Sequence, residues 1–353
     1  MSALTELTRH LRAGLDLPEA DCTAAARLLP RADVDPAEKK AFLLALHEKR
    51  ESIEEITAFA KVFRQLATDP KLSDLASEAI DIVGTGGSGS GGFNLSSTTA
   101  MLVAASGTRV LKHGNRAITS RSGAADFLTA HGIRMDTDPG LLRAAIEELD
   151  FCFFFAPAFH PAFKEIMPVR KELAAQGKPT VFNILGPLIN PAKPAYQLLG
   201  VFFPAMVKPL AGALGKLGLA RGLAVCSELP GIGNMDEFTT AGVNHVVGFG
   251  GMAGTQGKWK PDDVGFPPAD PAELIGGTAA ENMALLEDIL RGDGRQGLAD
   301  SIILNAAAAF LIVEKVDSLG EGCALAREIL YDGTLAAWLE KARAFYQSTG
   351  PGA

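Results

Sequence analysis

Apolar residues in the first 72 positions recur at the spacing of amphipathic helices. Leu4, Leu7, Leu11 and Leu15 fall every three or four residues, which places them on one face of a helix. Three more helices are expected to open near 18, 35 and 52, where proline, aspartate or serine precedes further periodic apolar residues. The pattern therefore predicts a small all-helical unit whose residues suggest no chemistry of their own.

From about residue 79 onward, short β-branched or aromatic runs alternate with helical segments. The expected strands are 79–83, 108–112, 151–155, 179–182, 222–226 and 245–249. Beyond residue 280 the pattern becomes helical, with helices expected at 281–290, 300–313, 319–331 and 335–347. Such alternation is typical of a mainly parallel sheet flanked by helices, with ligand loops at the carboxyl ends of the strands. The predicted fold class is α/β, a small helical N-terminal domain followed by a larger domain built on this sheet.

The segment from 156 to 200 breaks the alternation. It is dense in proline and glycine around one expected helix, from Pro161 to Ala175. A chain that leaves a sheet, forms a helix and returns through prolines resembles a crossover between domains. We therefore expect a helical domain at 1–72, completed by the crossover at about 160–190, and an α/β domain at 73–353.

Composition narrows the class of protein. Hydrophobic residues make up 47% and charged residues 21%, which is typical of a globular enzyme. The net charge of -8 argues against a broad basic surface for nucleic acid. Four scattered cysteines without a CxxC pair suggest a reduced, cytoplasmic compartment. The first residues lack the basic start and apolar core of a signal peptide, and the aromatic run 151–155 is too short to span a bilayer, so no membrane association is expected.

The most informative stretch begins where the strand 79–83 ends. Six of the nine residues from Gly84 to Gly92 are glycine, which allows positive φ and a close approach of backbone N–H groups to a ligand. The polar cluster from Asn94 to Thr99 then precedes an apolar helix. A glycine-rich loop that leads into a helix N-terminus predicts an anion site.

Two familiar phosphate loops do not fit this stretch. A Walker A loop ends in Gly-Lys-Ser/Thr, and no lysine occurs between Ala79 and Lys112. Gly84, Gly86 and Gly89 satisfy GxGxxG, but a dinucleotide fold also needs an acidic residue about 20 positions further on. Here the second strand leads instead into the basic sequence KHGNR, which favours a second phosphate contact.

These two loops resemble the paired signature of the anthranilate phosphoribosyltransferase family, whose fold is shared with the pyrimidine nucleoside phosphorylases. The matching strings are GTGGSGSGGFNLSS at 84–97 and KHGNRAITSRSGAAD at 112–126, with FNILGPLINPA and QLLGV later in the chain. The resemblance spans nearly the whole sequence. It implies an active site between the two domains and Mg²⁺-dependent transfer of the phosphoribosyl group from phosphoribosyl pyrophosphate to anthranilate, in tryptophan biosynthesis. It also implies a homodimer through the helical domain.

Donor and metal residues follow from the loops and from the resemblance. The donor-binding residues are expected to be Gly84, Gly86, Gly87, Ser88, Asn94, Ser96, Ser97, Lys112 and Ser120. Adjacent carboxylates at Asp236 and Glu237 would by themselves suggest helix-capping charges. The family places an Asp-Glu pair at this point, so the resemblance assigns them, with Ser96, to Mg²⁺ that also keeps water and substrate phosphates.

The acceptor side is expected on the crossover helix and the second loop. Arg170 can grip a carboxylate with two parallel hydrogen bonds, as anthranilate requires. The resemblance adds Gly84 and Asn115 to this site, and His113 would flank it. No general base is assigned, because an aromatic amine is already a neutral nucleophile.

The chain departs from the family pattern at several positions. Ser88 replaces an aspartate, Gly92 stands where threonine is common, and Ala124 replaces a serine. The segment 173–180 is longer than in the family and lacks its arginine. These departures touch donor contacts and the acceptor-side crossover, so the identity of the acceptor is the most open part of the prediction.

Two other kinds of function remain as alternatives. One is an enzyme with another acceptor, either a paralogue that uses a different carboxylated aromatic or a nucleoside phosphorylase. The phosphorylase needs no Asp236-Glu237 pair, and its lysine-serine phosphate signature is not evident. The other is a non-catalytic member that binds nucleic acid, which predicts eroded glycine and magnesium motifs and a basic cleft. This acidic chain keeps the motifs.

Overall fold

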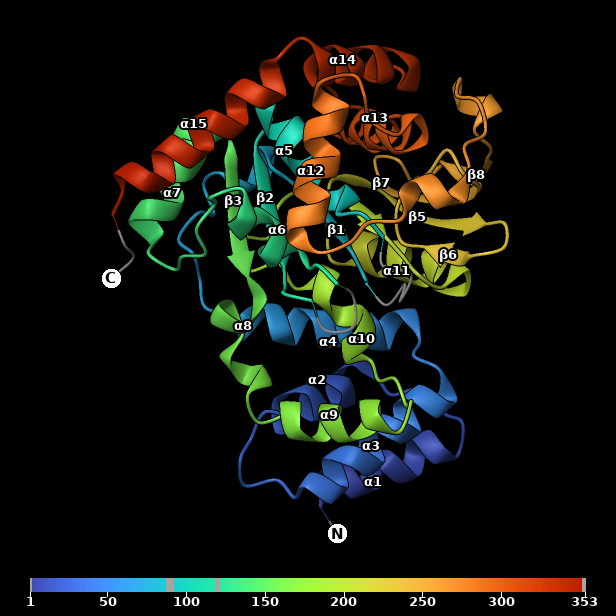
Figure 1. Ribbon diagram of the computed structural model, residues 1–353. Helices are drawn as coiled ribbons and strands as arrows, with labels where there is room; N and C mark the ends of the chain where they lie inside the picture. Colours follow the sequence, from blue (N-terminus) through green and yellow to red (C-terminus); the bar gives the residue numbers. More distant parts are fainter. Residues whose placement is uncertain (1, 87–91, 118–120, 351–353) are drawn as a thin grey trace.

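The computed structural model describes residues 2–86, 92–117 and 121–350. Its N-terminal part is helical, as expected (Figure 1). The four helices are α1 (Ala3–Arg12), α2 (Glu19–Leu28), α3 (Pro36–Lys49) and α4 (Ile53–Gln65). Side-chain caps at Asp35 and Ser52 start α3 and α4, and Ser52 forms a full capping box with Glu55. Figure 1 shows α4 lying between the other N-terminal helices and the lower end of the sheet.

The larger part is built on one mixed sheet. Its strands are β1 (Ile80–Gly84), β2 (Val110–Gly114), β3 (Phe151–Phe155), β4 (Tyr196–Gly200), β5 (Arg221–Leu229), β6 (Gly233–Met235), β7 (Val243–Gly250) and β8 (Gln256–Trp259). The strand order is β3-β2-β1-β4-β5-β7-β8, and β6 pairs with β5. Strands β1 to β5 are parallel to one another. Strands β6 and β7 are antiparallel to β5, and β8 is antiparallel to β7. The predicted fold class is therefore confirmed.

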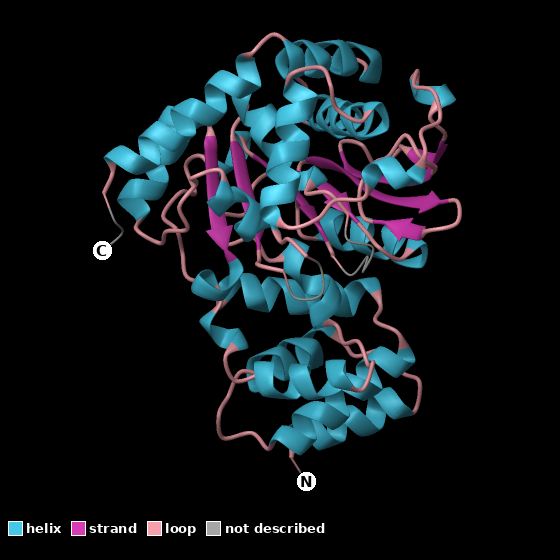
Figure 2. Ribbon diagram, in the orientation of Figure 1, coloured by secondary structure: helices cyan, strands magenta, loops and turns pink. Residues whose placement is uncertain are grey.

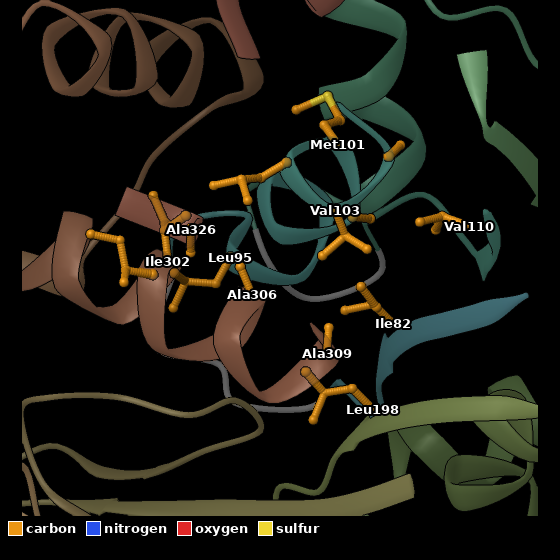
Figure 3. Close-up of a cluster of buried hydrophobic side chains, with 14 of the residues drawn as sticks. Ile82, Leu95, Met101, Val103, Val110, Leu198, Ile302, Ala306, Ala309 and Ala326 are labelled. Carbon is orange, nitrogen blue, oxygen red and sulfur yellow. The ribbon is translucent and has the colours of Figure 1, made fainter. Parts of the chain in front are cut away.

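Helices cover both faces of the sheet (Figure 2). The longer ones are α5 (Leu95–Ala105), α6 (Ala124–Ala130), α7 (Pro139–Leu149), α11 (Pro204–Lys216), α12 (Ala279–Leu290), α13 (Gln296–Ile312), α14 (Leu319–Tyr331) and α15 (Thr334–Ser348). The four expected C-terminal helices are confirmed, with α13 beginning earlier than expected. Helix α13 is buried along nearly its whole length. Figure 3 shows Ile302, Ala306 and Ala309 packed with residues of α5, β1 and β4.

The crossover contributes to the helical part. It contains α8 (Ala156–Phe159), a 3-10 turn (Pro161–Phe163), α9 (Met167–Ala175), α10 (Phe182–Leu185) and a second 3-10 turn (Gly186–Leu188). The single helix expected over 161–175 is thus broken before α9. Val169 and Leu173 share a hydrophobic core with Phe42 and Phe59 of the N-terminal helices, so α9 packs within the helical part. We keep the boundaries 1–72, 160–190 and 73–353 as a proposed domain division.

One expected strand is wrong, and the strands β4, β6 and β8 were not predicted. Residues 179–182 do not join the sheet, because Asn183 Oδ1 accepts the Thr180 N–H and the chain turns into α10. The fourth strand is instead β4, which pairs with β1 and β5 along its full length. Short buried strands of this kind are fixed by partners distant in sequence, which a local pattern does not reveal.

Candidate active site

Both predicted ligand loops leave the carboxyl ends of neighbouring parallel strands. β1 ends at Gly84, and α5 begins directly after Asn94. The end of the first loop is held by an N–H···O bond from Phe93 to Leu274 (3.1 Å) and a bridge between Gly92 and Ile275. The predicted donor residues Gly87, Ser88 and Ser120 lie outside the described residues.

The adjacent carboxylates predicted from the sequence lie against this loop. Asp236 Oδ2 accepts the Gly86 N–H (2.7 Å), and Glu237 Oε1 accepts the N–H of Ser96 in the first turn of α5 (2.8 Å). Removal from water raises the pKa of both carboxyls, and the charge of Asp236 raises the pKa of Glu237 further. A pair of carboxylates is therefore held beside backbone donors at a helix N-terminus.

Glycines make this close approach possible. A Cβ atom at Gly84 would lie 2.3 Å from Asp236 Oδ2, and one at Gly200 would lie 1.6 Å from the Asp236 carbonyl oxygen. Gly84 and Gly200 are paired across β1 and β4, so both strand ends are shaped to admit Asp236. Gly84 was expected to contact both substrates, and the structure places it against the carboxylate.

These residues fit a hard divalent cation. Two half-buried carboxylates with raised pKa values gain from a nearby positive charge, and oxygen is the ligand that Mg²⁺ prefers. Among the described residues, no cluster of three or more His, Cys, Asp or Glu could hold a metal by itself. The donor set therefore suits a cation that keeps waters and substrate phosphates as its other ligands. Ser96, the third predicted ligand, adjoins the pair through its backbone bond to Glu237.

Lys112 is buried within the sheet, with 1% of its surface exposed. Its Nζ donates to the carbonyl oxygen of Ile82 and to Ser96 Oγ, the latter at 3.4 Å. Burial lowers the pKa of Lys112 to about 8, and the charges of Asp81 and Glu237 oppose that shift. The lysine thus links β2 to β1 and to the start of α5.

Polar side chains in the first turns of α5 are buried. The hydroxyls of Ser97, Thr98 and Thr99 have no hydrogen-bond partner among the described residues. Unpaired buried hydroxyls are costly, so their presence at a helix N-terminus favours a polar ligand there. Ser97 was predicted to bind the donor, whereas Thr98 and Thr99 were not singled out.

Asn94 has a scaffold role in this structure. Its Oδ1 accepts from Ser122 Oγ (2.8 Å) and from Asn282 Nδ2 (2.7 Å). These bonds join the first loop to the second loop and to α12. Asn282 was missed by sequence reasoning, since it lies far along the chain in an ordinary helical pattern.

The second loop is closed at its base by one carboxylate. Asp126 Oδ2 accepts the N–H groups of Ala117 (2.9 Å) and Gly123 (3.0 Å). A Cβ atom at Gly123 would lie 2.2 Å from the Ala117 nitrogen, so glycine is required there. Ala124 is the first residue of α6.

Arg170 of α9 lies between two aromatic rings. Its guanidinium carbon is 5.7 Å from the centre of the Phe163 ring and 5.5 Å from that of Phe182. Its described polar contacts are the Phe182 carbonyl oxygen (3.4 Å) and the Met167 sulfur (3.8 Å), neither of which is charged. Burial lowers the pKa of Arg170. This arginine can therefore receive a carboxylate.

A continuous row of side chains connects Arg170 to β2. His113 lies 3.1 Å from the Gly186 carbonyl oxygen through Nδ1 and 3.2 Å from His160 Nε2 through Nε2. The His160 ring packs on Phe163, which contacts Arg170. We call His113, His160, Phe163 and Arg170 the acceptor-side row. His160 was not predicted, although the sequence HPAF at the start of the crossover marks its place.

Asn115 lies at the exposed end of β2, and its Oδ1 accepts the N–H of Arg116 (2.8 Å). The predicted residues therefore form two groups. Gly84, Gly86, Ser96 and Lys112 lie near the two carboxylates. The acceptor-side row begins at His113, which directly follows Lys112 on β2, so the two groups adjoin there.

Within the described residues, no helix has the length and apolar character that crossing a bilayer requires.

Two family models match the chain. One, described as the a/b domain of a glycosyl transferase family, covers residues 76–336, and the other, its helical bundle domain, covers residues 5–67. Fold and site thus define a glycosyl transferase with a helical bundle and an α/β domain.

Individual relatives show which members of this glycosyl transferase family the chain resembles. An anthranilate phosphoribosyltransferase of Thermus thermophilus is 42% identical over 94% of this chain and 96% of its own, and one of Symbiobacterium thermophilum is 39% identical over 96% of each. A crystal structure of anthranilate phosphoribosyltransferase from Thermus thermophilus has a TM-score of 0.85 at 40% identity, covering 97% of this chain and 99% of the other. The Saccharomyces cerevisiae enzyme in complex with PRPP and Mg has a TM-score of 0.81 at 25% identity, covering 98% of each chain. The chain belongs to the anthranilate phosphoribosyltransferase family, which confirms the resemblance found in the sequence.

Proposed function

We propose that this protein transfers the phosphoribosyl group of phosphoribosyl pyrophosphate to anthranilate, giving N-(5-phosphoribosyl)anthranilate and pyrophosphate, in tryptophan biosynthesis. The observation that carries the proposal is the placement of Asp236 and Glu237 against the N–H groups of the glycine loop and α5. It is supported by the names of the relatives and by the S. cerevisiae structure with PRPP and Mg.

In this proposal the donor lies at the glycine loop and the start of α5. Backbone N–H groups there would bind phosphate oxygens, and the buried hydroxyls of Ser97 and Thr98 would add donors. Asp236, Glu237 and Ser96 would hold Mg²⁺, which when bound neutralises charge on the leaving pyrophosphate. The proposed donor set also keeps Gly84, Gly86, Gly87, Ser88, Asn94, Lys112 and Ser120.

The acceptor would lie along the acceptor-side row. Arg170 would hold the carboxylate of anthranilate, and Gly84, His113 and Asn115 would complete its site. The amine nitrogen forms a bond to the anomeric carbon as the bond to pyrophosphate breaks, and the nitrogen then loses a proton. A neutral aromatic amine needs no strong base to begin this step, so His113 is assigned an orienting role.

The assembly and location are proposed from the family resemblance. We infer a homodimer through the helical domain and a cytoplasmic location, to which the scattered cysteines add support. No membrane or nucleic-acid partner is proposed. A different carboxylated aromatic acceptor is the alternative, because the longer segment 173–180 follows directly after Arg170.

The test is a fluorescence assay of anthranilate consumption by purified protein with phosphoribosyl pyrophosphate and Mg²⁺. Loss of anthranilate at an ordinary enzymatic turnover, roughly one per second or more, and its abolition by EDTA would support the proposal. Donor binding by calorimetry without anthranilate consumption would keep the donor site and reject anthranilate as the acceptor.

A further inference from the structure

The two strands that carry the donor and acceptor residues are paired only at their start. The register between β1 and β2 is the single pair Ile80–Val110. By contrast, β1 pairs with β4 along all five residues, and β2 pairs with β3 along all five. A buried parallel ladder that stops after one pair leaves backbone groups that need other partners.

Side chains supply these partners. The Ile82 carbonyl oxygen accepts from Lys112 Nζ, and the Leu111 carbonyl oxygen accepts from Asn190 Nδ2 (2.8 Å). The His113 N–H donates to Asp81 Oδ1 (3.2 Å). A buried set of side chains therefore fills the space between the strands.

Asp81 and Asn190 are joined at the centre of this set. Asn190 Nδ2 donates to Asp81 Oδ2 (2.9 Å), and the Asn190 Oδ1 accepts the Ala192 N–H (3.0 Å). Asp81 is fully buried, which raises its pKa to about 6, and the charges of Lys112 and Arg64 oppose that shift. Both oxygens of the carboxylate are thus bonded to different segments, one to β2 and one to the returning crossover.

The crossover segment that contains Asn190 is bound to the rest of the protein by consecutive residues. We call residues 186–190 the junction turn. The carbonyl oxygen of Gly186 lies by His113 Nδ1, that of Pro187 accepts from Gln197 Nε2 (2.8 Å), and that of Leu188 accepts from Arg64 Nε (2.6 Å). The turn therefore meets β2, β4 and α4, and its bond to Asp81 adds β1.

We propose that Asp81 and Asn190 are positioning residues for the transfer reaction, which together hold the ends of β1 and β2 apart and fix the junction turn. Their bond fixes the end of β1, which leads into the glycine loop, relative to His113 and the acceptor-side row on β2. The inference rests on the proposed function, since it assigns these two residues to the alignment of its two substrates. Small misalignments of reacting groups are costly, and a shift of about 1 Å can lower a rate about a hundredfold.

The experiment compares Asp81→Asn, Asn190→Ala and the double variant with Gln197→Met. Asparagine at 81 has one acceptor oxygen, so it cannot serve both His113 N–H and Asn190 Nδ2. Gln197 is the matched control, because it is a buried amide that bonds the same junction turn from β4, outside the space between β1 and β2. Urea unfolding of each variant gives its stability, and steady-state kinetics give kcat and the KM for each substrate.

Each single variant is expected to raise the anthranilate KM about tenfold or more and to lower kcat, with a smaller change in donor affinity. The double variant should be no worse than the more affected single variant, because both substitutions remove the same bond. Gln197→Met should lose stability without the rise in anthranilate KM. Three outcomes would overturn the proposal. The first is a rise in anthranilate KM in the double variant equal to the product of the single-variant rises. The others are an unchanged anthranilate KM in the folded single variants and an equal rise in Gln197→Met.

Hydrogen exchange of the peptide spanning 108–116 provides a readout independent of turnover. Exchange at this peptide should be faster in Asp81→Asn and Asn190→Ala than in Gln197→Met at matched stability. If Asp81→Asn does not fold, Asn190→Ala carries the same test. Wild-type protein that turns over no anthranilate would reject the proposed function, whereas unchanged exchange in both variants would reject the positioning network.

Discussion

His160 donates a hydrogen bond from Nε2 to Nε2 of His113 over 3.2 Å. The direction follows from Gly186, whose carbonyl oxygen can only accept, so His113 carries its proton on Nδ1 and offers a lone pair at Nε2. Burial lowers the pKa of both rings, which favours their neutral forms at neutral pH. A proton added to Nε2 of His113 would face the Nε2–H of His160, and the hydrogen bond between the rings would be lost.

Burial makes this neutral pair sensitive to acid. It lowers the pKa of His113 to about 3 and that of His160 to about 4, and the pKa of buried His131 falls to about 4. A lowered histidine pKa contributes stability above the unfolded value of 6.5, and this contribution is lost as pH falls toward the folded value. Asp81 acts in the opposite direction, because burial raises its pKa to about 6 and its contribution is lost as pH rises through that value.

We therefore expect His113, His131 and His160 to lower the free energy of unfolding as pH falls from about 7 to about 5. Asp81, Asp236 and Glu237, whose pKa values are raised, act in the opposite direction. Each histidine contributes up to about 1.4 kcal/mol per pH unit. His160→Gln keeps an N–H donor for His113 and should reduce the slope by about that amount. Urea unfolding across this range measures it, and a slope that is the same in wild type and variant would contradict the assignment.

Gly84→Ala should impair activity by displacing Asp236. The new Cβ would lie 2.3 Å from Asp236 Oδ2, and relief of such overpacking costs about 1–3 kcal/mol. We expect at least about a tenfold loss in kcat/KM for the donor. Gly320→Ala is the control, because its Cβ meets nothing within 4 Å in α14 and should stabilise the protein by up to about 1 kcal/mol. Full activity in folded Gly84→Ala would show that the contact is dispensable.

Arg170→Ala should raise the anthranilate KM about tenfold to a hundredfold, because charge-assisted hydrogen bonds contribute about 1.5–3 kcal/mol. Donor binding, followed by calorimetry, should be spared. Arg170→Lys keeps the charge but loses the planar fork, so it should recover only part of the affinity. An unchanged anthranilate KM in Arg170→Ala would remove Arg170 from this role.

Glu237→Gln should raise the Mg²⁺ concentration needed for half-maximal activity by about tenfold or more, because it removes one charge from the proposed metal site. The glutamine oxygen can still accept the Ser96 N–H, so the local fold should persist. Glu228→Gln on β5 removes an exposed carboxylate bonded to His245 and serves as the control. Equal Mg²⁺ dependence in both variants would argue against Glu237 as a ligand.

Patterns that depend on nearby residues were readable from the sequence. Ser52 with Glu55 marked the start of α4, and the run from Phe151 to Phe155 became β3 without change. The glycine loop and the Asp236-Glu237 pair also stood out, because each combines residue types that packing alone does not require. Their roles in binding stay predictions.

The rest depended on partners distant in the sequence. The β4 strand from Tyr196 to Gly200 is defined by pairing with β1 and β5, and Val181 lies in a turn because the crossover buries it with the helical part. Asp81 looked like one polar residue in an apolar strand. Its importance emerges only when Asn190 arrives from the crossover.

The most direct test of the central claim measures pyrophosphate release and anthranilate consumption in the same reaction with phosphoribosyl pyrophosphate and Mg²⁺. Transfer to anthranilate predicts equal amounts of the two, and no pyrophosphate release above background when anthranilate is omitted. Pyrophosphate release that does not depend on anthranilate, or that requires a different aromatic acceptor, would contradict the claim.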